Sequence, residues 1–294
     1  MSFMKLGAID EGSNAIRVLI ADVSNENGRY ACTKLAYLRL PVRLGSDVFN
    51  KGKISDENIE KLLEGMRIFK SYLQFYGVTK YQAVATSAMR DTSNGKKITE
   101  RIKKETGIKL KVISGKQEAE LVYLTFQLIP DLKMNYVLID VGGGSTEITL
   151  FRDNKVHAAR SFQIGSVRLL NQKVNPSEWK ALTQWLTEEI KPYHPEKIYG
   201  SGGTINNVHK VLDKHERDAV TLEEIVHLKQ DLIPLSMQEI TRLYPIKPDR
   251  ADVIVPAMEV FITIMEVLEA DEIFVPKMGL SDGVLLALHR ELTA

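Results

Sequence analysis

The spacing of apolar residues along the chain predicts alternating strands and helices. Short apolar runs and runs with a period of two predict strands at 6–10, 16–20, 30–40, 81–86, 110–113, 137–139, 148–150, 156–162, 198–199 and 272–275. Apolar residues three and four positions apart predict helices at 55–76, 94–106, 114–128, 176–193, 222–232, 236–244, 250–268 and 281–292, with another beginning at 205. This order of elements, repeated twice, indicates an α/β protein of two domains.

The stretch 137–151 combines two predicted strands with a glycine turn at 142–144. Glycine lets backbone N–H groups approach a ligand closely, and successive N–H groups in a turn form a concave anion site. Asp140 enters the turn and Glu147 leaves it, so two carboxylates flank the place predicted for a phosphate. Carboxylates beside a phosphate favour binding of a hard cation such as Mg²⁺. The alternative interpretation of the glycine segment is a flexible Gly-Ser linker that binds no ligand.

A similar strand–turn–strand pattern occurs near the start of the chain. Asp10 and Gly12 take the places of Asp140 and Gly142 in this repeat. An internal repeat on this scale predicts two related domains, 1–128 and 129–294, that offer one phosphate turn each to a shared active-site cleft. The boundary is expected near 127–133, and the helix at 281–294 is a candidate to complete the first domain.

Two further features are candidates for chemistry. Glu118 follows a Ser114–Gln117 capping pattern and shares the inward helix face of Leu121 and Val122. A carboxylate on a buried face is costly unless it is paired or functional, and local hydrogen bonding is the structural alternative. The glycine-rich segment 200–204 precedes a helix, a position that favours an anion or a nucleotide, although a close-packed turn without ligand would have the same sequence.

Composition narrows the class of protein only slightly. The chain has 294 residues, 44% hydrophobic and 26% charged, which is typical of a globular protein. Its net charge of +1 gives no indication of DNA binding, and no apolar run is long enough for a membrane-spanning helix. Cys32 is the single cysteine, so an intrachain disulfide is excluded. With no signal-peptide pattern at the N-terminus, we expect a cytoplasmic protein.

Several motifs together resemble the exopolyphosphatase and guanosine pentaphosphate phosphohydrolase (Ppx/GppA) family, within the actin, Hsp70 and sugar-kinase superfamily. They lie in the family's order at 9–17, 85–90 with Asn94, 113–115 with Glu118 and Ala119, 140–147, 200–204, 250–256 and 279–285. The resemblance implies two ribonuclease H-like (actin-like) α/β domains with an active-site cleft between them. None of the six histidines is followed by aspartate, so the chain resembles the short, two-domain form without the His-Asp domain.

The resemblance also implies roles for individual residues. Glu118 matches the catalytic base that prepares the attacking water, and Glu147 matches a second acid that holds water or metal. Asp140, Glu147 and Asp10 are the implied metal ligands. Phosphate contacts are implied for Ser13, Asn14, Arg17, Arg90, Gly142, Gly143, Gly144, Ser145, Gly202, Gly203 and Thr204. A surface role is the alternative for Arg17.

These residues predict a metal-dependent phosphoanhydride hydrolase that uses Mg²⁺, with Mn²⁺ as the alternative ion. The expected substrates are inorganic polyphosphate or the guanosine penta- and tetraphosphates, and the sequence does not separate them. The resemblance also allows a homodimer. Two other hypotheses stay open: an ATP-binding kinase of the same superfamily, and a non-enzymatic sensor of polyphosphate or an alarmone. Phosphate release without an acceptor distinguishes the hydrolase from both.

Overall fold

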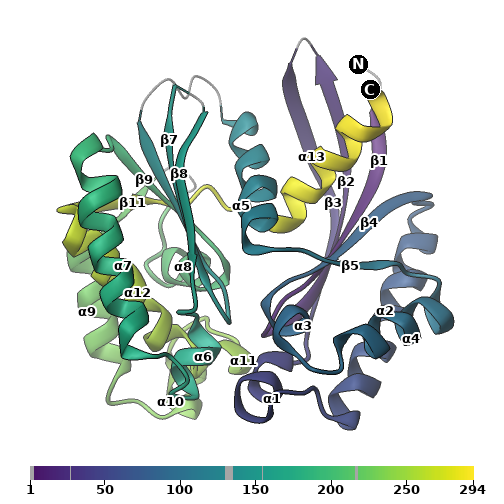
Figure 1. The fold of residues 1–294 in the computed structure, drawn as a ribbon, viewed down its shortest axis with the longest axis horizontal. Helices are drawn as coiled ribbons and strands as arrows, with labels where there is room; N and C mark the ends of the chain where they lie inside the picture. The colour runs from purple at the N-terminus through teal and green to yellow at the C-terminus, as the bar shows by residue number, and fades with distance from the viewer. Residues whose placement is uncertain (1–2, 27, 130–134, 154, 216–217) are drawn as a thin grey trace. The chain divides into compact units, whose positions relative to one another are not determined.

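The computed structural model describes residues 3–26, 28–129, 135–153, 155–215 and 218–294. The chain forms two compact units, the first made of Met1–Asp131 together with Gly279–Ala294, and the second of Leu132–Met278. Each unit contains one mixed sheet with helices packed against it, so the predicted α/β class is confirmed (Figure 1). The predicted boundary region at 127–133 lies partly outside the described residues.

The first unit is built on a sheet with the strand order β3-β2-β1-β4-β5. Its strands are β1 (Met4–Glu11), β2 (Ala15–Glu26), β3 (Arg29–Pro41), β4 (Lys80–Ala85) and β5 (Leu110–Val112). Strand β2 is antiparallel to both β1 and β3, whereas β1, β4 and β5 are parallel. Strand alternation directs Ile9 and Val18 to one face of the sheet and Asp10 and Arg17 to the other.

Helices pack on both faces of the first sheet. The Ile9 face forms a core with α1 (Leu44–Lys51), α2 (Asp56–Phe75), α3 (Ser87–Asp91) and α4 (Gly95–Thr106). Ser55 caps α2 by accepting a hydrogen bond from the Asn58 N–H, and Gly77 follows its end with φ 67°. Helix α13 (Leu280–Thr293) packs against β1, β2 and β4 and against α5 (Gly115–Leu124), which a 3₁₀ turn at Thr125–Leu128 extends.

The second unit repeats this arrangement with the strand order β10-β11-β9-β6-β7-β8. Its strands are β6 (Tyr136–Val141), β7 (Thr146–Arg152), β8 (Lys155–Phe162), β9 (Lys197–Ser201), β10 (Ala219–Thr221) and β11 (Glu272–Phe274). Strand β7 is antiparallel to β6 and β8, and β9 is parallel to β6 and β11. Strands β6 to β9 therefore correspond to β1 to β4, and the predicted internal repeat is present in the fold.

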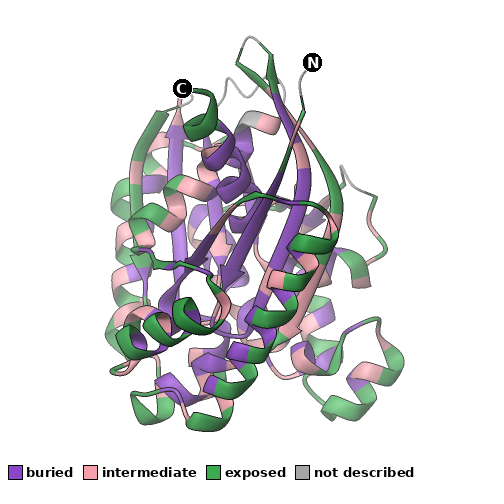
Figure 2. Ribbon diagram, turned by 90° about the vertical axis from the view of Figure 1, so that its right-hand side faces the viewer, coloured by how far each residue is buried: buried purple, intermediate pink, exposed green. Residues whose placement is uncertain are grey.

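One face of the second sheet carries the helical core. The helices of this unit are α6 (Ser166–Leu170), α7 (Pro176–Trp185), α8 (Gly203–Val211), α9 (Leu222–Leu232), α10 (Met237–Leu243), α11 (Pro248–Ala251) and α12 (Ile254–Leu268). Val137 and Ile139 of β6 pack with Phe261 of α12 in this core. The central strands β1, β2, β6, β7 and β9 are mostly buried, whereas β3 and β8 are mostly intermediate or exposed. In Figure 2 the outward surfaces of many helices are coloured as exposed.

Two long helices that the pattern predicts are interrupted in the structure, and proline explains both corrections. The predicted helix 176–193 continues beyond α7 as a π-helical segment, Leu186–Ile190, and a 3₁₀ turn, Lys191–Tyr193, because Pro192 has no N–H to donate. The predicted helix 250–268 is divided into α11 and α12, since Pro256 is accommodated only in the first turn of a helix.

Short elements account for most of the other differences. Helices α1, α3 and α6 and strand β10 were not predicted, and each is short, with three to eight residues in which a period is hard to recognise. Across the described ranges, no helix has both the length and the apolar character needed to cross a membrane.

Candidate functional site

The turn of the first unit that is predicted to bind phosphate lies between β1 and β2, and it is held by the segment that begins α1. The turn closes on itself through a bond from the Gly12 N–H to the Ala15 carbonyl, 3.1 Å. The Ser13 carbonyl accepts from the Gly45 N–H (2.7 Å), and the Asn14 carbonyl accepts from the Arg43 N–H (3.0 Å). A Cβ on Gly45 would lie 2.8 Å from the Ser13 Cβ, so glycine is required for this close approach.

Ser13 and Asn14 are buried at this turn. The Ser13 hydroxyl is 2.8 Å from the hydroxyl of Ser87, the first residue of α3. The carboxyl end of β4 is thereby tied to the turn that follows β1. Sequence reasoning noted Ser87 only as part of a motif, and the contact depends on strand order, which the sequence does not specify.

Asp10 and Arg17 form an ion pair across β1 and β2. Arg17 Nη1 donates to Asp10 Oδ2 at 2.8 Å, and the two residues face each other in the strand register. Arg17 is also opposite Arg39 of β3, so two arginines and one carboxylate lie side by side on this face of the sheet. The structure thus brings Asp10 and Arg17 together, and the Asp10 side chain is engaged by a cation of the protein itself.

Glu11 is a buried carboxyl that sequence reasoning missed. It is fully buried at the end of β1, and neither carboxyl oxygen has a hydrogen-bond partner among the described residues. Burial raises the pKa of Glu11 well above its ordinary value, and the neighbouring Asp10 raises it further while Arg17 lowers it. Burial and the neighbouring Asp10 thus favour the protonated form of this acid, which lies directly before the turn at Gly12.

Arg90 and Glu118 lie close together in the first unit. Arg90 Nη1 donates to the Ile113 carbonyl at 2.9 Å and is 4.0 Å from Glu118 Oε2. Ser114 and Gln117 form the predicted capping box, which fixes the first turn of α5 and the direction of Glu118. The Glu118 side chain is 12% exposed, whereas Glu120 is exposed, so the predicted inward orientation of Glu118 is confirmed.

The glycine turn of the second unit is closed by the same backbone hydrogen bond as the first. The Gly142 N–H bonds to the Ser145 carbonyl at 2.9 Å, which corresponds to the bond from Gly12 to Ala15. The carbonyl of Gly142 accepts from the Ser166 N–H at 3.0 Å. A Cβ on Gly165 would lie 2.5 Å from the backbone of Gly143, so the chain before α6 packs directly on the turn.

Asp140 and Glu147 are directly opposite each other on β6 and β7. Their side chains project from the sheet face opposite the helical core, because Val137 and Ile139 alternate with Asp140 along β6. Glu147 is 4% exposed and accepts a hydrogen bond from the Ser161 hydroxyl at 2.8 Å. The predicted pair of carboxylates beside the glycine turn is therefore present.

A third turn joins β9 to α8. Gly202 has φ 101°, and a Cβ there would lie 2.9 Å from Asp140 Oδ1, so this turn adjoins the Asp140 carboxylate. A Cβ on Gly203 would overlap the guanidinium of Arg250, which is 9% exposed. Gly203 and Thr204 begin α8, where the helix dipole favours an anion, and Arg250 adds a positive charge. Arg250 was noted in the sequence as part of a motif, without a role.

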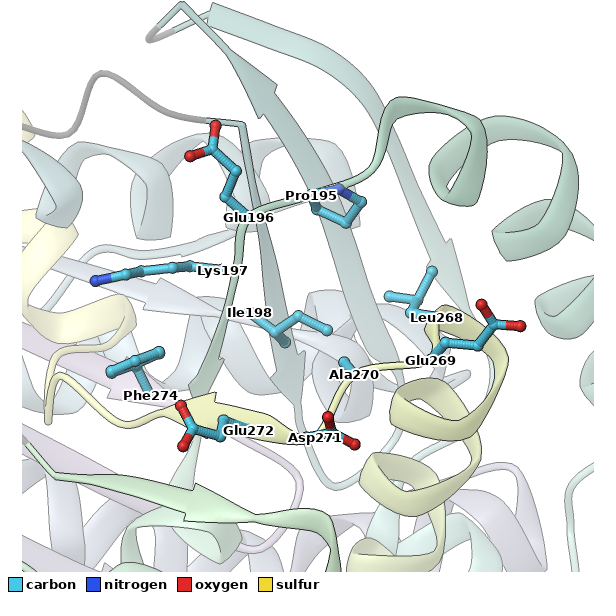
Figure 3. A pocket seen from close by; sticks show the side chains of 10 residues that line it. All are labelled: Pro195, Glu196, Lys197, Ile198, Leu268, Glu269, Ala270, Asp271, Glu272 and Phe274. Carbon is cyan, nitrogen blue, oxygen red and sulfur yellow. The ribbon is translucent and has the colours of Figure 1, made fainter.

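A separate pocket of about 380 Å³ lies at the other end of the second sheet (Figure 3). Its lining includes Lys197 and Glu272, the first residues of β9 and β11, and Leu268 at the end of α12. None of the predicted site residues lines it. Open α/β sheets bind ligands at the carboxyl ends of their strands, where the three turns lie, so we do not assign this pocket to the same function.

The donor set suits a hard cation that binds partly through its substrate. Within the described ranges no three acidic, histidine or cysteine side chains cluster closely enough to enclose a metal ion by themselves. Mg²⁺ commonly binds one or two carboxylates and completes its shell with phosphate oxygens and water. Asp140 and Glu147, paired on one sheet face beside an anion turn, fit that mode of binding.

The fold and these turns define an α/β protein with two related units, each carrying a turn between its first two strands that is closed by a backbone hydrogen bond. The Ppx/GppA phosphatase family model matches residues 19–291, and the chain belongs to this family. A crystal structure of an exopolyphosphatase from Cytophaga hutchinsonii superposes with a TM-score of 0.84 at 25% identity, covering 98% of each chain. The predicted fold class of ribonuclease H-like (actin-like) domains is thereby confirmed, while a shared cleft stays a prediction.

Two relatives show how the similarity extends along the chain. The bifunctional 3-dehydroquinate synthase/phosphatase of Fusobacterium nucleatum is 31% identical over 310 residues, which cover 95% of this chain and 46% of that protein. This chain thus spans about half the length of that relative. Exopolyphosphatase 2 of Mycobacterium tuberculosis is 27% identical over 318 residues, covering 98% of this chain and 99% of the relative.

Proposed function

We propose that this chain hydrolyses phosphoanhydride bonds and releases inorganic phosphate from the end of inorganic polyphosphate. Supporting this proposal are its family and the name of Exopolyphosphatase 2, which aligns along nearly its whole length. The single observation that carries it is the pair of Glu118 and Arg90, a candidate base beside a candidate phosphate-binding cation. A protein that only bound phosphate would gain nothing from a carboxylate at that place, because like charges repel.

In the proposed reaction a water molecule attacks the terminal phosphorus in line with the bond to the rest of the chain. Glu118 orients this water and accepts its proton, a role typically worth about 10²- to 10⁴-fold in rate. The shortened polyphosphate is the leaving group, and inorganic phosphate is the other product. The Arg90 guanidinium stabilises the negative charge of the transferring group, and the backbone N–H groups of a phosphate turn do the same.

Asp140 and Glu147 are the proposed ligands of Mg²⁺, with Mn²⁺ as an alternative. The bound ion would supply charge neutralisation at the phosphate oxygens. Ser161 donates a hydrogen bond to Glu147 through its hydroxyl and so helps to fix the orientation of this carboxylate. Asp10, the third predicted ligand, is engaged by Arg17, and we propose for it the lesser role of directing that arginine.

The guanosine pentaphosphate pppGpp is a second proposed substrate, because its 5′ end carries the same kind of anhydride. The turn before α8 supports this proposal, since Gly203, Thr204 and Arg250 together offer N–H groups and a cation to an anionic ligand.

Cys32, which is half-buried and outside any disulfide, suits a reducing compartment, and we propose a cytoplasmic location.

The test is phosphate release by the purified chain from polyphosphate, pppGpp and ATP, measured side by side with and without Mg²⁺. The proposal predicts release from polyphosphate without any acceptor, and little release from ATP. Transfer from ATP only when an alcohol or sugar is added would indicate a kinase. Tight binding of polyphosphate with no release would indicate a sensor.

A further inference from the structure

The glycine turn of the second unit has its carbonyls held one after another. The Gly142 carbonyl accepts from the Ser166 N–H at 3.0 Å, and the Gly143 carbonyl accepts from the Val167 N–H at 2.8 Å. The third carbonyl, that of Gly144, accepts from a side chain, because Arg168 Nε donates to it at 2.9 Å. The start of α6 therefore holds every carbonyl of the three glycines.

The first unit holds its turn with backbone groups in the corresponding places. Ser13 and Asn14 correspond to Gly143 and Gly144, and their carbonyls accept from the N–H groups of Gly45 and Arg43. The two units thus differ in the kind of donor that bonds to the last carbonyl of the turn. In the first unit a backbone N–H holds it, whereas in the second unit the guanidinium of Arg168 does so.

Holding a carbonyl also sets the direction of the next N–H group. In a trans peptide the C=O of one residue and the N–H of the next point in opposite directions. Bonds to the carbonyls of residues 142, 143 and 144 therefore direct the N–H groups of residues 143, 144 and 145 away from α6. Three N–H groups turned to the same side form the concave anion site that a phosphate requires.

We propose that Arg168 is a positioning residue for the phosphate turn and acts through the Gly144–Ser145 peptide. The proposal rests on the proposed function, since the turn is assigned to phosphate there. Arg168 is half-buried and bonded to the turn from the side opposite the N–H groups. Its effect is to keep the Ser145 N–H aimed at the ligand without contact between the guanidinium and the substrate.

Two substitutions at this position separate positioning from simple support of the fold. Arg168→Met removes the donor and keeps much of the apolar stem, whereas Arg168→Lys keeps a donor and a charge without the planar fork. Arg242→Met is the matched control, because Arg242 is exposed in α10 of the same unit. All variants are compared with the unchanged chain for thermal stability first.

Three measurements follow on the full chain. Hydrogen exchange is recorded for the peptide spanning 141–150. Binding of methylenediphosphonate, which water cannot cleave, is measured by calorimetry with Mg²⁺ present. The values of kcat and KM are obtained with polyphosphate. In Arg168→Met we expect faster exchange in the turn, probe binding weakened by about tenfold to a hundredfold, and unchanged thermal stability. Arg168→Lys should recover part of the binding, and Arg242→Met should match the unchanged chain.

Wild-type exchange in the turn and wild-type probe binding in Arg168→Met would overturn the proposal. Faster exchange throughout the second unit with a lower melting temperature would also overturn it, because Arg168 would then merely support the fold. If Arg168→Met does not fold, Arg168→Lys decides the question through the same comparisons. If the unchanged chain releases no phosphate, the proposed function fails, while exchange and probe binding still decide the role of Arg168.

Discussion

Arg90 Nη1 lies 4.0 Å from Glu118 Oε2, and the same nitrogen donates to the Ile113 carbonyl at 2.9 Å. Arg90 belongs to α3 and Glu118 to α5, so two separate helices of the first unit bring a cation and a carboxylate to one place. The carbonyl at the end of β5 fixes the guanidinium, and the capping box of α5 fixes the acid. This arrangement is the basis for the predictions on turnover.

Arg90→Ala should lower kcat/KM for polyphosphate, because it removes a charge-assisted contact to phosphate. Such a contact is worth roughly 1.5–3 kcal/mol, which corresponds to about tenfold to 150-fold. Steady-state kinetics with Lys61→Ala as an exposed control measure the effect. An unchanged kcat/KM in Arg90→Ala would remove Arg90 from the site.

Ser161→Ala should weaken Mg²⁺ binding by roughly tenfold, because the hydroxyl that orients Glu147 is lost. Glu147→Gln should weaken it more, since the ligand itself changes. The Mg²⁺ concentration that gives half-maximal activity is the measurement, with ion binding followed by calorimetry as a second readout. Equal Mg²⁺ dependence in the unchanged chain and in Glu147→Gln would show that Glu147 is not a ligand.

Glu11 should make the stability of the first unit depend on pH. Its raised pKa means that the unfolded chain releases this proton near the ordinary value of 4.5, while the folded chain keeps it. The contribution of Glu11 to the free energy of unfolding is therefore greatest below about pH 4.5. It falls as the pH rises from there towards the pKa of Glu11 in the folded chain, by about 1.4 kcal/mol per pH unit because one proton is involved.

Glu11→Gln should remove that slope, and Glu11→Leu should raise the stability of the first unit near neutral pH. Hydrogen exchange in β1 between pH 5 and pH 8, corrected for intrinsic rates, follows this unit by itself. The nearby charges of Asp10 and Arg17 are kept in both variants. The interpretation would be wrong if Glu11→Gln showed the same pH dependence as the unchanged chain.

Gly165→Ala should reduce activity through steric overlap alone. Gly165 has φ −141°, which any residue adopts, but a Cβ there would lie 2.5 Å from the backbone of Gly143 and Gly144. The turn must then move, and we expect a loss in kcat/KM of about tenfold or more. Gly142→Ala is the milder comparison, because its nearest neighbour would be the Ser145 carbonyl at 3.2 Å. Full activity in Gly165→Ala would show that the turn tolerates displacement.

The sequence predicted the long elements and the duplicated turns because their signals are local. Alternation along β1 and β2 and the glycines at 142–144 are visible in a few consecutive residues. The inward face of Glu118 followed from helical spacing, and its burial agrees. The apolar period continues past Pro192 and Pro256, so the period alone does not show where these two helices are interrupted.

The contacts that hold the turns could not be predicted, because they join segments distant in sequence. The bonds from Gly45 to Ser13 and from Val167 to Gly143 depend on short helices without a readable period. The Arg168 side chain bonds to a carbonyl, and nothing in its local sequence distinguishes it from a surface arginine. Glu11 is in the sequence only one residue of the motif at 9–17, and the burial of its carboxyl, with no hydrogen-bond partner among the described residues, is a property of the packed sheet.

The central claim is that Glu118 activates water for attack on a bound phosphate. The most direct test is Glu118→Gln, which keeps the size of the side chain and removes its basicity. We expect kcat for polyphosphate to fall by about 10²- to 10⁴-fold, while methylenediphosphonate binds with the affinity of the unchanged chain. A kcat within a fewfold of the unchanged chain, at equal probe affinity, would contradict the account.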